Sequence, residues 1–254
     1  LGMRNYLLVK CFCFIASVFF INLSNTNAQI SAPNASQNIY TPSSEKVAHI
    51  KVLEAKFAAT NGGDETNVAS TGTNYDVKYY RLELRINPDT LGGGTAGKYI
   101  RGKITTYFTT KTANFTVVNF DFGTPLVCDS VYYHGAKLAA GKINRPTDLL
   151  QLTVPNIAVI GTLDSISVYY KGVPQVEPLF NSGYRNTKHN TTQNYTYTLS
   201  EPYSSFTWWP CKSYIVNDKA DSVDLIVSTP TGFKAAGNGR LVSEITTGGS
   251  VVAY

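Results

Sequence analysis

From Tyr75 onward, apolar and polar residues alternate in short runs, which is the pattern of half-buried β-strands. The first run alternates apolar and charged positions and ends at Asn87-Pro88-Asp89. Further runs cover 100–108, 115–122, 126–133, 149–154, 163–170, 223–228 and 250–254. Their spacing, mostly about ten to fifteen residues, predicts an all-β domain with an antiparallel, saddle-like or sandwich-like sheet.

The chain before Tyr75 lacks this alternation. Residues 29–42 are rich in Ser, Asn and Pro, which is typical of a loosely structured segment. The stretch 44–59 predicts a short helix, because Ser43 or Ser44 can cap it and apolar residues recur at helical spacing. That apolar stripe consists of Val47, Ile50, Leu53 and Phe57. Residues 60–74 are rich in Gly, Asn and Thr and indicate a linker. We therefore expect a helix and linker over 29–74 and a β domain over 75–254.

Residues 1–28 have the features of a secretory signal peptide. Arg4 and Lys10 precede and open an apolar stretch, 11–23, and Thr26-Asn27-Ala28 supplies small residues for cleavage. The alternative is a membrane anchor, but the apolar run of about thirteen residues is short of the roughly 20 that span a bilayer. We expect an exported protein, periplasmic, cell-surface or extracellular, without a stable membrane span.

The composition of the chain gives little support to nucleic-acid binding and favours β structure. The 254 residues carry a formal net charge of +5, and 15% of them are charged. Because no block of Lys and Arg is longer than a pair, nucleic-acid binding has little support. Abundant Tyr and Thr favour β structure.

Removal of the signal peptide would leave two cysteines, Cys128 and Cys211. In an oxidising compartment they can form one disulfide between the strand near Cys128 and the loop that holds Cys211. The alternative is two separate buried thiols, and the sequence does not decide between them. Two cysteines alone cannot build a tetrahedral zinc site.

The most informative stretch runs from 198 to 240. It contains Glu201 before Pro202, then Trp208-Trp209-Pro210-Cys211-Lys212, then Asp218-Lys219-Ala220-Asp221, and finally Gly237-Asn238-Gly239. The proline biases Glu201 toward extended backbone, and the final Gly-Asn-Gly predicts a turn with positive φ. The two indoles could stack on a ligand, although loop and core packing is the commoner role. A solvated loop with weak local ion pairs is the prediction for Lys212, Lys219 and Asp221.

This ordered set of motifs resembles the N-terminal domain of the M1 family of zinc aminopeptidases, in the secreted branch of Bacteroidetes-type bacteria. The resemblance is strongest over 184–242 and extends more weakly back to Tyr75. It implies that Glu201 binds the free α-amino group of a peptide substrate, whereas the alternative is a carboxylate that only accepts backbone N–H bonds. In the family, Gln often stands two positions earlier, where this chain has Leu199.

The catalytic motif of that family is absent from the sequence. His49, His134 and His189 form no His-Glu-x-x-His, so zinc would be bound outside this segment by a catalytic domain. The run that ends at Tyr254 stops in a strand-like segment, which indicates a β domain that is incomplete at its C-terminus and a truncated product that is inactive alone. The expected partners are a peptide N-terminus and the missing catalytic domain. The alternative function is a free-standing secreted β-sandwich for adhesion or glycan binding.

Overall fold

The computed structural model describes residues 72–89, 98–175, 182–190, 192–200, 204–213 and 219–254, and the backbone of the two-residue strand β1 (Phe19–Phe20). The expected helix over 44–59 lies outside these ranges, as does Glu201. Within them the chain has strands and two short 3₁₀ helices but no α-helix, so the all-β prediction is confirmed. None of the described helices is long and apolar enough to cross a membrane.

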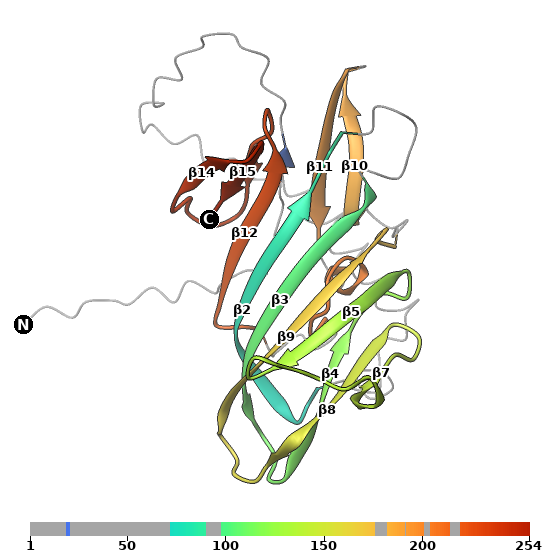
Figure 1. The fold of residues 1–254 in the computed structure, drawn as a ribbon, viewed down its shortest axis with the longest axis vertical. Helices are drawn as coiled ribbons and strands as arrows, with labels where there is room; N and C mark the ends of the chain where they lie inside the picture. The colour runs from blue at the N-terminus through green and yellow to red at the C-terminus, as the bar shows by residue number, and fades with distance from the viewer. Residues whose placement is uncertain are drawn as a thin grey trace, which may run out of the picture.

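The elements follow one another along the chain as shown in Figure 1. The strands are β2 (Tyr75–Ile86), β3 (Ile100–Thr110), β4 (Phe115–Asp121), β5 (Leu126–Tyr133), β6 (Ala136–Lys137), β7 (Ile143–Asn144), β8 (Leu149–Ile157), β9 (Leu163–Gly172), β10 (Gly183–His189), β11 (Gln193–Leu199), β12 (Ser222–Pro230), β13 (Ala235–Ala236), β14 (Glu244–Thr247) and β15 (Ser250–Ala253). The 3₁₀ helices are η2 (Ala140–Lys142) and η4 (Ser205–Thr207).

The larger sheet has eight strands in the order β14-β15-β12-β2-β3-β9-β5-β6. All of its pairings are antiparallel except one, because β12 runs parallel to β2, with Ser222 opposite Tyr79 and Ser228 opposite Arg85. The sheet is therefore mixed where the sequence predicted an antiparallel one. A parallel pairing needs a long connection, and here β3 to β11 and the tryptophan loop all intervene between β2 and β12.

A smaller sheet, in the order β4-β8-β7, packs against one face of the larger sheet to form the core. Aromatic rings join the two layers. Tyr75 of β2 contacts Phe115 and Phe120 of β4 edge to face, with ring centroids 6.1 and 6.3 Å apart. Tyr170 of β9 contacts Phe122, which follows β4, at 5.7 Å. This layered core explains why alternate residues of β2, β3 and β9 are buried.

The hairpin β10–β11 is an element that the sequence reasoning missed. Its buried positions on β11 are polar, with Asn194, Thr196 and Thr198 each at most 5% exposed, while Tyr195 and Tyr197 are only partly buried. Buried and exposed residues therefore alternate along β11 as in the other strands, but here the buried residues are the polar ones. Two side-chain amides anchor the hairpin to the end of β2: Asn186 donates to the Pro88 carbonyl at 3.0 Å, and Asn194 donates to the Asp89 carboxylate at 3.1 Å.

The turn after β12 differs in part from the prediction. Gly232 has φ of 94° and follows the end of β12 at Pro230, as a glycine in a tight turn does. The prediction of positive φ at Gly237-Asn238-Gly239 is wrong, since none of these residues has it. This segment lies beside Leu225 of β12, and a Cβ at Gly237 would make a close contact of 3.1 Å with the Leu225 side chain.

Candidate functional site: a cleft beside the tryptophan loop

The loop 204–213, which holds the two tryptophans, is fixed to the end of β4. Asp121 and Cys211 exchange two backbone hydrogen bonds, of 2.8 and 3.0 Å. The buried Asp121 carboxylate also accepts a hydrogen bond from the Ser213 backbone N–H at 2.7 Å. These bonds fix the C-terminal side of the loop, and the Gly123 backbone N–H fixes the other side by donating to the Phe206 carbonyl at 2.8 Å. The two indoles between these points are therefore held against the core.

Trp208 is a core residue. Its side chain is 1% exposed, and its indole N–H donates to the Ser200 hydroxyl at 3.2 Å. Trp209 packs edge to face on Tyr80 of β2, with ring centroids 4.8 Å apart. Packing is therefore the role of Trp208, as the sequence favoured, while Trp209 is partly buried and also borders the cleft described below.

Lys212 differs from the prediction of a solvated loop lysine. Its ammonium group donates to the Tyr75 carbonyl at 2.8 Å and lies 4.6 Å from the centroid of the Tyr75 ring. Its backbone N–H donates to the Tyr80 hydroxyl at 3.1 Å. Asp221, in contrast, is exposed and forms the expected surface ion pair, with Lys78 at 3.4 Å.

A cleft of about 850 Å³ opens between the tryptophan loop and β12. One wall consists of Ser200, Trp208 and Trp209, and another consists of β12 from Ser222 to Val227 together with 235–242. Its rim carries exposed apolar side chains: Val223 is 40% exposed, Leu241 61% and Val242 74%. Apolar surface gathered around a cleft is typical of a binding or docking site.

Glu201, the candidate substrate ligand, lies outside the described residues. The described residues that flank it are well fixed. Ser200 lines the cleft, and its carbonyl accepts a hydrogen bond from the Ser204 backbone N–H at 2.8 Å. Ser204 is buried, and its hydroxyl pairs with that of Ser182 at 2.7 Å. Ser200 and Ser204 flank the segment that contains Glu201, and both are held by hydrogen bonds. Ser200 also lies in the wall of the cleft.

The sequence left open whether Cys128 and Cys211 form a disulfide or two separate buried thiols, and the structure has both as free thiols. Cys128 lies on β5 opposite Tyr170, whereas Cys211 lies in the tryptophan loop with its thiol 3.3 Å from the Ser205 hydroxyl. Burial raises the pKa of Cys128 to about 11 and raises the pKa of Cys211 further. Such thiols are inert at neutral pH, in contrast to catalytic cysteines.

Sequence reasoning missed Asp121 and Tyr80, the residues that hold the tryptophan loop in place. Asp121 ends a strand and Tyr80 lies in the middle of one, so neither has a motif around it. The signal available in the sequence was an acidic residue inside the apolar run 115–122, since a carboxylate among core residues needs hydrogen-bond partners. Among the described residues, no group of His, Cys, Asp and Glu is arranged to hold a metal ion.

Comparison with known proteins finds solved structures that are similar to this chain. No family model matches the sequence, and no curated protein matches it significantly. Among solved structures, an M1 zinc metallopeptidase from Deinococcus radiodurans matches with a TM-score of 0.62 and 18% identity, over 75% of this chain and 41% of that one. A mutant from the same organism, bound to a Tyr-Ser-Ala substrate, matches with a TM-score of 0.59 and 18% identity, over 71% of this chain and 38% of that one.

A two-domain M1 zinc metallopeptidase mutant bound to L-arginine gives a similar match, with a TM-score of 0.59 and 19% identity over 71% of this chain and 38% of that one. This chain therefore spans about two fifths of the length of each solved structure it resembles. At these identities the likeness establishes a shared fold, and the fold is that of part of an M1 zinc metallopeptidase.

Proposed function

We propose that this chain is the N-terminal, substrate-site-forming domain of an exported zinc aminopeptidase that removes N-terminal amino acids from peptides. One observation carries the proposal. The chain shares a fold with M1 zinc metallopeptidases, and its Ser200 and Trp208-Trp209 motif residues line a single cleft. The motif variant of this chain, with Glu201-Pro202 followed by Trp208-Trp209-Pro210-Cys211, resembles that of the secreted Bacteroidetes-type branch, and the proposal extends to that branch.

The zinc ion in this proposal is bound by a catalytic domain outside the segment. This chain would contribute one wall of the substrate site and a docking surface for that domain. The rim of the cleft supports such docking, because Val223, Leu241 and Val242 leave apolar side chains exposed beside a deep hollow. The segment alone is accordingly proposed to be inactive, with no chelator-sensitive release of amino acids.

Glu201 is the residue proposed to contact substrate. An aminopeptidase must hold a free ammonium group at a fixed distance from the scissile carbonyl, and a carboxylate does this by a charge-assisted hydrogen bond. Acylated N-termini lack the charge, so they would leave the carboxylate unpaired and be rejected. The anchoring of Ser200 and Ser204 supports this role, since a substrate ligand needs a rigid base.

The test is Glu201→Gln in a longer chain that includes the catalytic domain. Loss of one charge-assisted hydrogen bond costs roughly 1.5–3 kcal/mol, which is about one to two decades in kcat/KM for a free N-terminal amine. Asp129→Asn, at an exposed carboxylate on β5 that does not line the cleft, serves as the matched control and should leave kcat/KM unchanged. An unchanged kcat/KM in Glu201→Gln would remove Glu201 from the site.

Two further observations test the wider proposal. The downstream reading frame should encode His-Glu-x-x-His, and a stop codon after a few strands would instead leave a free-standing β module. Mass spectrometry of the exported protein should find a mature N-terminus near Gln29. An intact N-terminus retained in the cytoplasm would contradict export.

A further inference from the structure

The face of the larger sheet that points away from the core carries a row of basic side chains. Arg85 of β2 lies directly opposite Arg101 of β3, and Arg101 lies opposite Lys171 of β9. Both arginines are exposed. Neighbouring strands are ~4.8 Å apart, so three positive charges cross the sheet at regular intervals, perpendicular to the strands.

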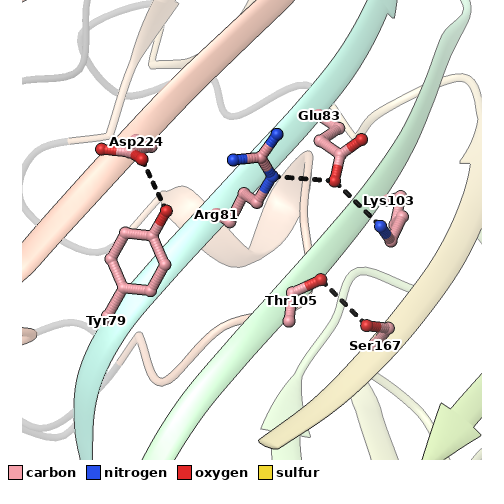
Figure 2. A network of polar contacts seen from close by, with 7 residues as sticks. All are labelled: Tyr79, Arg81, Glu83, Lys103, Thr105, Ser167 and Asp224. Carbon is pink, nitrogen blue, oxygen red and sulfur yellow. Dashed lines mark hydrogen bonds and ion pairs between the residues drawn. The ribbon is translucent and has the colours of Figure 1, made fainter. Parts of the chain in front are cut away.

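The two arginines lack a carboxylate partner among the described residues. Lys171 pairs with Asp129 at 2.7 Å. Glu83, the acidic residue of the next row, is already shared by Arg81 at 3.1 Å and Lys103 at 2.9 Å (Figure 2). The Arg101 guanidinium lies 5.6 Å from the centroid of the Tyr99 ring. Like charges directly opposite in a sheet are destabilising, so an uncompensated Arg-Arg pair points to an anion that binds there.

The surroundings of this pair match a carbohydrate. The arginines lie in a hollow of about 560 Å³ that Lys103, Tyr169 and Ser228 also line. Two carboxylates line it as well, Glu83 and Asp129, and each is already paired with a lysine. Tyr169 is 37% exposed and contacts Tyr132 edge to face at 5.4 Å, while Tyr107 is 38% exposed and lies 5.5 Å from Tyr79. Exposed aromatic rings offer apolar faces on which sugar rings stack.

Hydroxyl groups lie on the same face of the sheet as the tyrosines and the charged residues. The Thr105 and Ser167 hydroxyls pair across β3 and β9 at 2.9 Å, and the Tyr79 hydroxyl donates to the Asp224 carboxylate at 2.6 Å (Figure 2). All three hydroxyls can still accept a hydrogen bond from a sugar hydroxyl, and whichever of Thr105 and Ser167 accepts within their pair also keeps its own proton to donate. Counting the charged residues named on this face and Asp129, five are basic and three are acidic, so the face favours an anionic ligand.

We infer that this face of the sheet binds a polyuronate chain, with Arg85 and Arg101 holding a carboxylate and Tyr169 stacking on a sugar ring. A guanidinium fork suits a carboxylate because it binds both oxygens at once. A chain laid across the strands would bring its repeated carboxylates past the row of Arg85, Arg101 and Lys171. The inference uses only the described sheet face and is independent of the proposed peptidase role.

The test is isothermal titration of the full 254-residue chain with an oligogalacturonate, and with the same oligomer after methyl esterification of its carboxylates. We expect the ester to bind at least about tenfold more weakly, because it loses the charge-assisted bonds. Added salt should weaken binding of the acid form. Equal affinity for acid and ester would overturn the inference, as would the absence of binding.

Matched variants separate this site from a general charge effect. Arg85→Gln with Arg101→Gln should weaken oligogalacturonate binding about tenfold. Lys142→Gln with Lys188→Gln removes the same charge from exposed positions elsewhere and should change it by less than about twofold. Equal losses in both pairs would overturn the inference. Because all four positions are exposed, circular dichroism should show folded protein in every case.

Tyr169→Ala tests the stacking and keeps the charges. It should weaken the oligogalacturonate complex several-fold while leaving the difference between acid and ester forms in place. An oligothymidylate of equal charge is the competitor for polyanion binding in general. If it binds as tightly as the oligogalacturonate, or if Tyr169→Ala has no effect on sugar binding, the face is an unspecific basic surface and the inference fails.

Discussion

At the scale of single residues, Trp208 shows how a motif residue can serve the fold rather than the chemistry. Its indole is 1% exposed and lies between the core and Ser200, whose hydroxyl it reaches. We predict that Trp208→Ala lowers the free energy of unfolding by about 3–5 kcal/mol, because it opens a large cavity. Chemical denaturation measures this change.

Leu163→Ala is the control for Trp208→Ala. Leu163 is 62% exposed, so its truncation should change the free energy of unfolding by less than about 0.5 kcal/mol. Equal effects of the two substitutions would show that Trp208 is not a core residue.

Glu83 gives the second prediction at this scale, through pH. Burial alone would raise the pKa of Glu83, but hydrogen bonds from Lys103 and Arg81 outweigh it and lower the pKa below its ordinary 4.5. A lowered pKa stabilises the folded state above pH 4.5, and the contribution is lost as the pH falls through the folded value. Thermal unfolding should therefore show that the native protein loses more stability between pH 6 and pH 3 than Glu83→Gln does.

The same comparison has an internal check. Lys103→Gln removes one of the two donors, so it should also reduce the loss of stability on acidification. If the native protein, Glu83→Gln and Lys103→Gln all lose stability equally between pH 6 and pH 3, the Glu83 contacts do not affect folding.

At the scale of elements, the pairing of β3 with β9 depends on a glycine. Gly102 lies opposite Tyr170, which is buried, and a Cβ at Gly102 would lie 2.4 Å from the Tyr170 ring. Since the ring is held in the core, it cannot move aside without disturbing its contact with Phe122. We predict that Gly102→Ala destabilises the fold by about 1–3 kcal/mol, the usual cost of overpacking.

Gly141→Ala is the matched substitution for Gly102→Ala. Nothing lies within 4 Å of a Cβ at Gly141, and its φ is not in the left-handed region. Denaturation midpoints should therefore be nearly unchanged for Gly141→Ala and clearly lower for Gly102→Ala. A stability equal to that of the native protein in Gly102→Ala would mean that the two strands can separate to admit a methyl group.

At the scale of the whole molecule, the apolar rim of the cleft is the surface proposed to dock against the catalytic domain. If the proposed catalytic domain covers the cleft, amide hydrogens of the rim strands should exchange more slowly in the longer chain than in this one. We predict this protection for 235–254, which includes Leu241 and Val242. Hydrogen exchange followed by mass spectrometry measures it.

Strands β3 and β9 serve as the reference in the exchange experiment. They lie in the middle of the larger sheet, so their protection should be the same in both chains. Equal exchange of 235–254 in the two chains would show that the cleft is not where the remaining chain docks.

The strands that the sequence predicted correctly share one property. In β2, β3 and β9 the sheet has one apolar and one polar face, so alternation along the chain reports burial directly. The sequence did not predict the hairpin β10–β11, because its buried residues include Thr196 and Thr198, and buried hydroxyls give no hydrophobic signal. The cleft was only half predictable, since the Trp208-Trp209 motif is local but its opposite wall is β12.

The sequence by itself thus determined the class of fold and most strand positions, because local alternation fixes which residues face a core. It also singled out the segment that flanks the cleft. Only the tertiary structure decided that β12 runs parallel to β2, that Cys128 and Cys211 remain apart as free thiols, and that Arg85 faces Arg101. Each of these depends on which strands become neighbours, and neighbours far apart in sequence are selected by packing of the whole core rather than by any local pattern.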